Sequence, residues 1–363
     1  MPLSRQTAEA ELLALFQRNG FSPSQVPILQ PAEPFIELSG EDIRRRLFLV
    51  SDAGEGETCL RPEFTIPAAR AHIAAHAVPA VAAYAFAGPV FRQRAEGPGE
   101  FIQAGLESFG RSDIEAADAE MLALAIEAEA LLGGEALTIR IGDVGLAAAL
   151  IESLALPPAV ARRLRQHGMT PAAGEKPRAS GLAAYQGVLN ALKGADPAEA
   201  RAFVKDLLSI AGLKAVGGRT PGEIADRFLE KASEESSGIS AEQGAILARF
   251  LAISGDPDTV AAEARALAAS AGLTLDAAID RFETRTGFMA ARGIDLGRLE
   301  ASTAFTRNLD YYSGFIFEFV ARTGERPAIA GGRYDGLFKR LGAGTEIPAV
   351  GCAIWLERFG GVA

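Results

Sequence analysis

Four short groups of polar residues interrupt an otherwise apolar, alanine-rich chain. They are Arg61 to Thr65, Phe91 to Arg94, the pair Gln103 and Glu107, and the run from Arg307 to Gly314. Carboxylates and amides accept hydrogen bonds from ammonium or imidazole groups, and arginines bind carboxylates or phosphates, preferably through two parallel hydrogen bonds. A pocket that combines both kinds of group suits an amino acid, with or without a nucleotide.

Each group also has a simpler interpretation when it is taken alone. Arginines and glutamates near strand ends are most often solvent-exposed ion pairs that contribute little to stability. Adjacent tyrosines such as Tyr311 and Tyr312 more often pack in a core with their hydroxyls hydrogen-bonded. The groups therefore point to a ligand site only if the fold brings them together.

The segments that must position these groups have the patterns of strands. We expect strands from Ala83 to Arg92 and from Phe101 to Phe109, and in the second strand Gln103 and Glu107 share one face because they are four residues apart. A further strand is predicted from Phe305 to Phe319, with its alternating phenylalanines on one side and its polar groups at one end. The polar groups are therefore expected together at one end of the sheet's strands.

The middle of the chain has a different character. From about Val144 to Ala291 it is dominated by Ala, Leu, Glu and Arg, with glycine and proline breaks. We predict a helical insertion over residues 158–272 within a discontinuous core domain of residues 1–145 and 290–363. The fold class is α+β, a largely antiparallel sheet flanked by helices, because the regular βαβ alternation of a doubly wound fold is missing.

Composition narrows the classes of function. The 363 residues are 48% hydrophobic, as in a globular protein, and their net charge of −10 makes a nucleic-acid partner a poor candidate. The two cysteines, Cys59 and Cys352, form no CxxC pair, which argues against a disulfide framework and favours a reducing, cytoplasmic location. No secretion signal and no membrane span are expected.

No metal and no cofactor are expected either. His72 and His76 are four residues apart, which places both on one face of a helix, but Ile73 stands where the glutamate of a zinc-protease motif would be. No third ligand is in view. A Walker-type nucleotide-binding run is also missing from the sequence.

All four groups, in order, resemble motifs of class II histidyl-tRNA synthetases. The resemblance covers about Leu3 to Val144 and Phe305 to Phe359 and includes a third motif from Gly351 to Arg358. It implies the class II aminoacyl-tRNA synthetase-like antiparallel sheet. It also implies a set of histidine-binding residues: Glu63, Thr65, Gln103, Glu107, Arg307, Tyr311 and Tyr312. Arg92 and Arg358 match positions that handle ATP phosphates, so they are candidates for a vestigial phosphate- or anion-binding site.

The chain departs from the synthetase pattern where ATP and tRNA are bound. Arg94 stands in place of a glutamate that helps to read adenine, and Asn308 stands in place of a glycine in the histidine-specific signature. The loop from Ala95 to Glu100 is shorter than usual and lacks basic residues. The chain also ends soon after the third motif, so a C-terminal anticodon-binding domain is not expected.

This combination is similar to the regulatory subunit family of ATP phosphoribosyltransferase. The similarity implies a non-catalytic subunit that activates a short-form catalytic subunit at the first step of histidine biosynthesis and mediates feedback inhibition by L-histidine. It further implies a homodimer, formed through the N-terminal region, within a hetero-oligomer. A tRNA partner and a membrane are not expected.

Two alternatives remain open at the level of sequence. The chain could be a truncated enzyme that forms histidyl-adenylate without binding tRNA, with Arg92, Arg307 and Arg358 neutralising phosphate charge. It could also be a scaffolding paralogue that has lost ligand binding altogether.

Overall fold

The computed structural model describes residues 3–39, 41–50, 56–75, 80–94, 97–167, 239–306, 311–321 and 326–362. The chain divides into two compact units, the first formed by residues 1–153 and 249–363 and the second by residues 154–248. In the second unit the described helices are α7 (Pro158–His167) and most of α11 (Ala241–Leu251). Residues 168–238 of the predicted insertion lie outside the described part, so the boundaries 158–272 stay a prediction.

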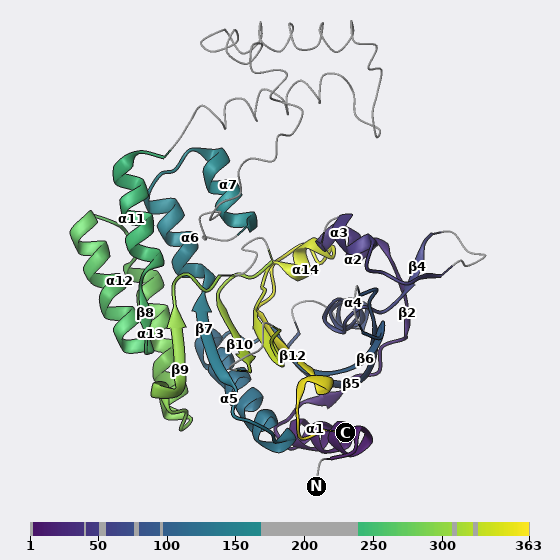
Figure 1. Cartoon of the computed structure of the whole chain (residues 1–363). Coiled ribbons are helices and arrows are strands. Elements are labelled where there is room, and N and C mark those ends of the chain that lie inside the picture. Colours follow the sequence, from purple (N-terminus) through teal and green to yellow (C-terminus); the bar gives the residue numbers. More distant parts are fainter. Residues whose placement is uncertain are drawn as a thin grey trace, which may run out of the picture. The chain divides into compact units, whose positions relative to one another are not determined.

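The first unit is built on a nine-stranded sheet with the order β1-β5-β6-β12-β11-β10-β7-β9-β8 (Figure 1). All neighbouring strands are antiparallel except the pairs β1–β5 and β7–β9. The predicted α+β class with a largely antiparallel sheet is confirmed. The strands are β1 (Ser22–Pro23), β5 (Ala82–Phe91), β6 (Glu100–Phe109), β7 (Thr138–Asp143), β8 (Ser254–Gly255), β9 (Leu299–Ser302), β10 (Phe315–Val320), β11 (Ile329–Arg333) and β12 (Ala349–Trp355).

Helices α1 (Arg5–Arg18) and α5 (Ile114–Leu132) pack along the sheet, and α13 (Asp276–Ala291) forms a further layer on α5. Helix α5 contacts β11 and β12 through a stripe of buried alanines and leucines, and α13 packs against α5. Small side chains in α5 allow this close approach, and the helix ends at Gly133, whose φ of 67° is one that glycine adopts without strain. The remaining elements of this region are α6 (Val144–Ser153), α12 (Pro257–Ala271), η2 (Leu296–Arg298) and η3 (Leu356–Arg358).

A smaller sheet with the order β2-β4-β3 lies near α4 (Thr65–Ala75) in Figure 1. A hydrophobic cluster that includes Phe35, Cys59, Phe109 and Phe338 joins this sheet to the helices around it. The cluster anchors the start of α4, where two of the predicted ligand-binding residues lie: Thr65 is the first residue of the helix and Glu63 precedes it. The other elements here are β2 (Leu29–Pro31), β3 (Leu49–Val50), β4 (Thr58–Leu60), α2 (Glu33–Ser39), α3 (Glu41–Arg44) and α14 (Leu337–Arg340).

Strand β10 is buried more completely than its sequence pattern predicts. Phe315, Phe317 and Phe319 share one face as expected, but Ile316 and Val320 on the other face are buried as well. The reason is position, because β10 is an interior strand with β7 on one side and β11 on the other. In the described part of the chain, no helix has both the length and the apolar character needed to cross a membrane.

Candidate functional site

A cavity of about 180 Å³ opens beside the middle of the large sheet. It is smaller than the sites of about 300–1,000 Å³ that hold drug-sized ligands, so its volume suits a molecule of amino-acid size. Polar side chains line most of it. The lining residues are Glu63, Thr65, Arg92, Gln103, Glu107, Tyr311, Tyr312, Ala330, Gly331, Tyr334, Gly351, Cys352, Ala353 and Trp355.

The floor of the cavity depends on a glycine that faces Glu107. In the sheet register, Glu107 of β6 pairs with Gly351 of β12. Directly opposed residues of antiparallel strands point to the same face, so the Glu107 side chain extends over a position that has no side chain. A Cβ added at Gly351 would lie 1.8 Å from Glu107 Oε2. Gly351 therefore provides the space that the carboxylate occupies.

Glu107 is almost fully buried, with 1% of its surface exposed. Its Oε1 accepts a hydrogen bond of 2.6 Å from Thr65 Oγ1, and its Oε2 accepts one from the Tyr334 hydroxyl. Burial raises the pKa of Glu107 well above its usual range, and the nearby charge of Glu63 raises it further. A cationic group of a ligand would remove this penalty by neutralising the carboxylate.

Glu63 places a second carboxylate beside the first. It precedes α4 and caps that helix, because its Oε2 and Oε1 accept hydrogen bonds from the backbone N–H groups of Thr65 and Ile66 at 2.5 and 3.0 Å. Burial raises the pKa of Glu63, although those two backbone N–H groups and Arg92 oppose the rise. The helix start thus orients Glu63 and Thr65 together, with the Thr65 hydroxyl turned to Glu107.

Three tyrosines form another wall. The rings of Tyr311 and Tyr334 are stacked with their centroids 5.5 Å apart, and Tyr312 meets Tyr311 edge to face at 4.9 Å. Burial raises the pKa of Tyr311 well above its usual range, with Tyr312 and the two glutamates adding to the effect. The Tyr311 hydroxyl therefore keeps its proton at neutral pH and can act as a hydrogen-bond donor.

Six of the seven predicted ligand-binding residues line this one cavity: Glu63, Thr65, Gln103, Glu107, Tyr311 and Tyr312. The seventh, Arg307, lies outside the described residues, as does Asn308. The sequence patterns did not single out Tyr334 as a site residue. Its position after the strand-and-turn run Gly331-Gly332-Arg333 was the only signal that could have suggested it.

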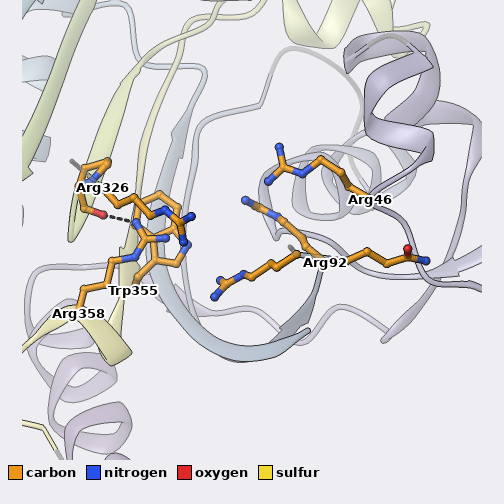
Figure 2. A pocket seen from close by; sticks show the side chains of 8 residues that line it. Arg46, Arg92, Arg326, Trp355 and Arg358 are labelled. Carbon is orange, nitrogen blue, oxygen red and sulfur yellow. Dashed lines mark hydrogen bonds between the residues drawn. The ribbon is translucent and has the colours of Figure 1, made fainter. Parts of the chain in front are cut away.

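A second cavity, of about 500 Å³, adjoins the first and is dominated by arginines (Figure 2). Arg46 and Arg92 approach it from one side, and Arg326, Trp355 and Arg358 from the other. We call it the arginine cavity; it is lined by Arg46, Arg92, Gln93, Arg94, Arg326, Pro327, Trp355 and Arg358. Arg92 and Trp355 line both cavities. The two residues predicted to bind an anion, Arg92 and Arg358, thus lie at one site.

Arg94, the position of the charge reversal, is held in place at the arginine cavity. Its Nη1 donates a hydrogen bond of 2.9 Å to Glu357 Oε1, and its guanidinium carbon lies 3.5 Å from the centroid of the Phe101 ring. The two partners of this ion pair are 263 positions apart in the sequence. The guanidinium of Arg94 therefore covers the face of the Phe101 ring on which a flat group of a ligand could otherwise stack.

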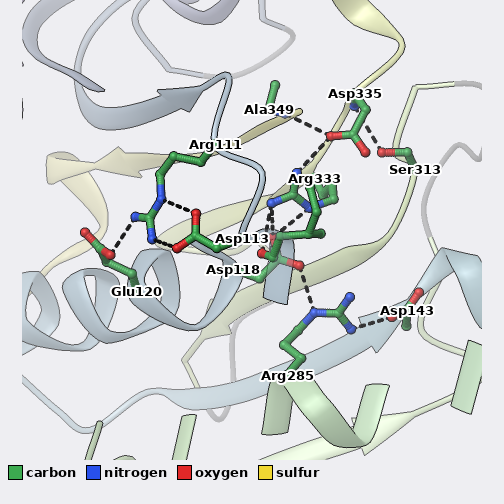
Figure 3. A network of polar contacts seen from close by, with 11 residues as sticks. Arg111, Asp113, Asp118, Glu120, Asp143, Arg285, Ser313, Arg333, Asp335 and Ala349 are labelled. Atoms are coloured by element: carbon green, nitrogen blue, oxygen red, sulfur yellow. Dashed lines mark hydrogen bonds and ion pairs between the residues drawn. The ribbon is translucent and has the colours of Figure 1, made fainter. Parts of the chain in front are cut away.

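A buried ionic network ties helices α5 and α13 to the large sheet (Figure 3). Asp118 of α5 is fully buried and accepts hydrogen bonds from Arg285 Nε at 2.8 Å and Arg333 Nε at 2.9 Å. Arg285 also bonds Asp143, and Arg333 also bonds Asp335. Burial acts to lower the pKa of Arg285, but Asp143 and Asp118 outweigh it and the pKa is raised.

The same network reaches the segment that carries the tyrosines. The backbone N–H of Asp335 donates a hydrogen bond of 3.0 Å to Ser313 Oγ, and that of Ser313 donates one of 2.8 Å to the Arg333 carbonyl. Ser313 follows Tyr312 directly. The position of the tyrosine wall is therefore set in part by charges on α5 and α13.

Of the two histidines four residues apart, only His72 lies in the described part of the chain. His72 is buried in α4 and its Nδ1 lies 3.1 Å from the Tyr84 hydroxyl, whereas His76 falls outside the described residues. Across the residues that the structure covers, no group of three or more His, Cys, Asp or Glu side chains could hold a metal ion. Cys352 lines the amino-acid-sized cavity, but burial raises the pKa of its thiol, so it stays protonated.

Comparison with known proteins gives a consistent result. A profile of the histidyl-tRNA synthetase family matches residues 3–216 and 204–359. The chain is 40% identical over 361 residues to the ATP phosphoribosyltransferase regulatory subunit of Mesorhizobium japonicum, covering 96% of this chain and 95% of that protein. It is 38% identical over 346 residues to the protein of the same name from Brucella canis, covering 92% of this chain and 91% of that one.

Solved structures share the fold at lower identity. One, described as an ATP phosphoribosyltransferase regulatory subunit/histidyl-tRNA synthetase from Bacillus halodurans, has a TM-score of 0.68 at 20% identity and covers 97% of this chain and 77% of that one. The histidyl-tRNA synthetase of Nostoc sp. PCC 7120 has a TM-score of 0.65 at 21% identity, covering 99% and 72%. The expected class II synthetase-like fold is thus confirmed.

Proposed function

The chain belongs to the ATP phosphoribosyltransferase regulatory subunit family, and from this premise we propose that it senses L-histidine and controls a short-form catalytic subunit. The relatives' names place it among regulatory and not catalytic subunits. The proposed action is activation of the catalytic subunit, with inhibition by histidine, the end product of the pathway. One observation carries this proposal: an amino-acid-sized cavity that holds two carboxylates and borders on an arginine.

The cavity has a partner for each polar part of histidine. Glu107 and Glu63 offer negative charge to the ammonium group or to an imidazole N–H, and Gln103 and the tyrosines offer further hydrogen bonds. Arg92, at the border with the arginine cavity, offers a guanidinium to the ligand carboxylate. We include Thr65, which holds Glu107 in place, and Arg307 among the histidine-binding residues.

Regulation requires that histidine bind one state of the complex more tightly than another. A ligand with equal affinity for both states shifts no equilibrium, and coupling between two sites is typically worth about 1–3 kcal/mol. The buried network from Asp118 to Ser313 gives the tyrosine wall a mechanical connection to α5 and α13. A movement of the tyrosines on ligand binding would therefore be transmitted to those helices.

The remaining parts of the proposal concern partners and place. The chain acts as a homodimer within a hetero-oligomer that contains the short-form catalytic subunit, in the cytoplasm, and without tRNA or a membrane. Arg92 and Arg358 retain the ability to bind an anion, since both line the arginine cavity. No cofactor is required for this activity.

The test measures the activity of a purified short-form ATP phosphoribosyltransferase with and without this chain, in the presence and absence of L-histidine. We expect stimulation that histidine reverses, and loss of the histidine effect in Glu107→Gln and Tyr311→Phe. Glu100→Gln, at the exposed end of the same strand as Glu107, is the matched control and should behave as the wild type.

Two results would refute this proposal. One is the absence of stimulation at every ratio of the two proteins, together with no complex in size-exclusion chromatography. The other is histidine-dependent exchange of pyrophosphate into ATP by the chain alone, because that would identify it as an adenylate-forming enzyme.

A further inference from the structure

The arginine cavity concentrates positive charge that the nearby carboxylates of Glu63 and Glu357 offset only in part. It is lined by five arginines, Arg46, Arg92, Arg94, Arg326 and Arg358. In the described part of the chain, only Arg94 has a carboxylate within ion-pair distance, that of Glu357. Four further guanidinium groups around one space of about 500 Å³ amount to a strongly positive site on a chain whose net charge is −10.

Several of these arginines are fixed in position by contacts that leave their charge available. Arg92 Nε donates a hydrogen bond of 2.7 Å to the Pro62 carbonyl, and Arg358 Nη1 donates one to the Pro327 carbonyl. Neutral carbonyls orient a guanidinium without neutralising it. Burial lowers the pKa of Arg92 to about 10, with Arg46, Arg94 and Arg358 adding to the effect against Glu63. Arg92 is therefore still charged at neutral pH.

Both aromatic rings beside this cavity are already covered by an arginine. The guanidinium carbon of Arg94 lies 3.5 Å from the Phe101 centroid, and that of Arg358 lies 4.6 Å from the Trp355 centroid. Phe101 is itself buried. A nucleobase or another flat group would have to displace an arginine in order to stack, and in the case of Arg94 it would also break the ion pair with Glu357.

We propose that the arginine cavity binds a small oligophosphate without a nucleobase, such as inorganic diphosphate or triphosphate. The inference deepens the proposal that Arg92 and Arg358 hold an anion, and it adds Arg46 and Arg326 as ligand-binding residues. Guanidinium groups bind phosphate oxygens through paired hydrogen bonds, and several that converge from two sides fit an anion with several charges. Figure 2 shows this arrangement of the two sides.

The cavity favours a compact phosphate over an acidic peptide. Its arginines converge on one hollow, and its volume lies within the range of about 300–1,000 Å³ that is usual for small-molecule sites. The walls come from segments that are distant in the sequence, around Arg46, Arg92 and Arg358. Such a site binds a ligand only when the fold is complete.

The chain has an intrinsic probe for the test. Trp355 is its only tryptophan and lines the arginine cavity, so its fluorescence reports binding without a label. The full-length chain is titrated with inorganic diphosphate and triphosphate, with sulfate at matched ionic strength, with ATP and with a glutamate-rich decapeptide. Calorimetry repeats the ATP titration, because adenine absorbs light. We expect saturable binding of triphosphate that is tighter than that of ATP or sulfate.

Arg46 and Arg326 are the residues to change, because both are exposed and their removal leaves the buried structure intact. Loss of one charge-assisted contact should weaken triphosphate binding about 10- to 150-fold, and Arg46→Ala/Arg326→Ala should weaken it more. Arg44→Ala is the matched control, since Arg44 is two residues away and pairs with Glu57 instead. It should bind as the wild type does.

Three outcomes would overturn the inference: no saturable response to either phosphate, tighter binding of ATP than of triphosphate, or binding of the acidic peptide alone. The test is independent of histidine sensing. If L-histidine fails to bind while triphosphate binds, the proposed function falls and this site stands. If L-histidine binds normally and neither phosphate binds, the oligophosphate site is refuted and the proposed function stands.

Discussion

Replacement of Glu107 by glutamine tests the central claim about the amino-acid-sized cavity. The change removes the charge and the ionisable proton but keeps the shape of the side chain. Glutamine still has an oxygen that accepts from Thr65 Oγ1 and an amide group that can donate to the Tyr334 hydroxyl. The fold should therefore tolerate the change, and the effect on ligand binding should come from the lost charge.

The expected effect on affinity follows from the loss of a charged hydrogen bond in a buried site. Such a bond is worth about 1.5–3 kcal/mol, which corresponds to L-histidine binding about 10- to 150-fold more weakly. At a ligand concentration of about 100 times the wild-type Kd, the wild type gains about 2.7 kcal/mol of stability. For a chain of 363 residues this gain raises the Tm of the wild type by about 3.5 °C. The same ligand concentration should raise the Tm of the variant by about 2 °C or less.

The same variant tests the raised pKa of Glu107. The folded chain holds this proton to higher pH than the unfolded chain does, since burial raises the pKa in the folded state only. The stability that the group contributes is thus complete below the ordinary glutamate pKa of about 4.3 and is lost as the pH rises through the folded pKa. Glu107→Gln should remove this loss, so its Tm without ligand should fall less as the pH rises above about 4.3.

The assay is thermal unfolding of both chains from pH 5 to pH 9, with and without L-histidine. Glu100→Gln is the control for a glutamate at the exposed end of the same strand. A variant with an unchanged histidine shift would show that the carboxylate does not bind the ligand. A variant whose Tm falls more steeply with pH than that of the wild type would contradict the raised pKa.

Three further predictions concern the surroundings of the cavity, and thermal or urea unfolding checks each of them. Tyr334→Phe removes the donor to the buried carboxylate and should cost about 1–3 kcal/mol, whereas unchanged stability would argue against that hydrogen bond. Gly351→Ala should cost about 1–3 kcal/mol because its Cβ overlaps a carboxylate oxygen, and Gly287→Ala, in open space within α13, should instead add about 1 kcal/mol. Asp118→Asn should cost about 3–5 kcal/mol by removing a buried negative charge that Arg285 and Arg333 share, and a loss no greater than that of Arg265→Ala in an exposed cluster, expected below about 1 kcal/mol, would contradict this.

The sequence was sufficient to predict the parts of the site that depend on local patterns. The alternation in β6 placed Gln103 and Glu107 on one face, and the fold does turn both into the cavity. For β10 the alternation predicted only the face that carries the phenylalanines. Burial of its second face depends on the interior position of the strand in the sheet. A period of two specifies which residues share a face but not whether both faces are covered.

Contacts between distant segments were beyond the reach of the sequence. Nothing near Arg94 indicates that Glu357 neutralises it, and nothing near Arg46 or Arg326 places them beside Arg92. These contacts arise only when the fold brings the ends of β5 and β12 to one cavity with the segments after α3 and before β11. The resemblance alone indicated the charge reversal at Arg94. Only the structure shows that Arg94 stacks on Phe101 and so covers that ring.

The position of β12 between β6 and β11 has a consequence for synthesis on the ribosome. Strands β1, β5 and β6 form one part of the sheet and β11, β10, β7, β9 and β8 form another, and only β12 joins them. The ribosome reaches Ala349 well after Phe109, about 12–50 s later at usual rates of elongation. During this interval β6 has an unpaired edge of the kind that promotes aggregation. A nascent chain that stalls before β12 would therefore keep the edge of β6 unpaired. Among the described strands β12 is made last, and it is the strand that joins the two parts of the sheet.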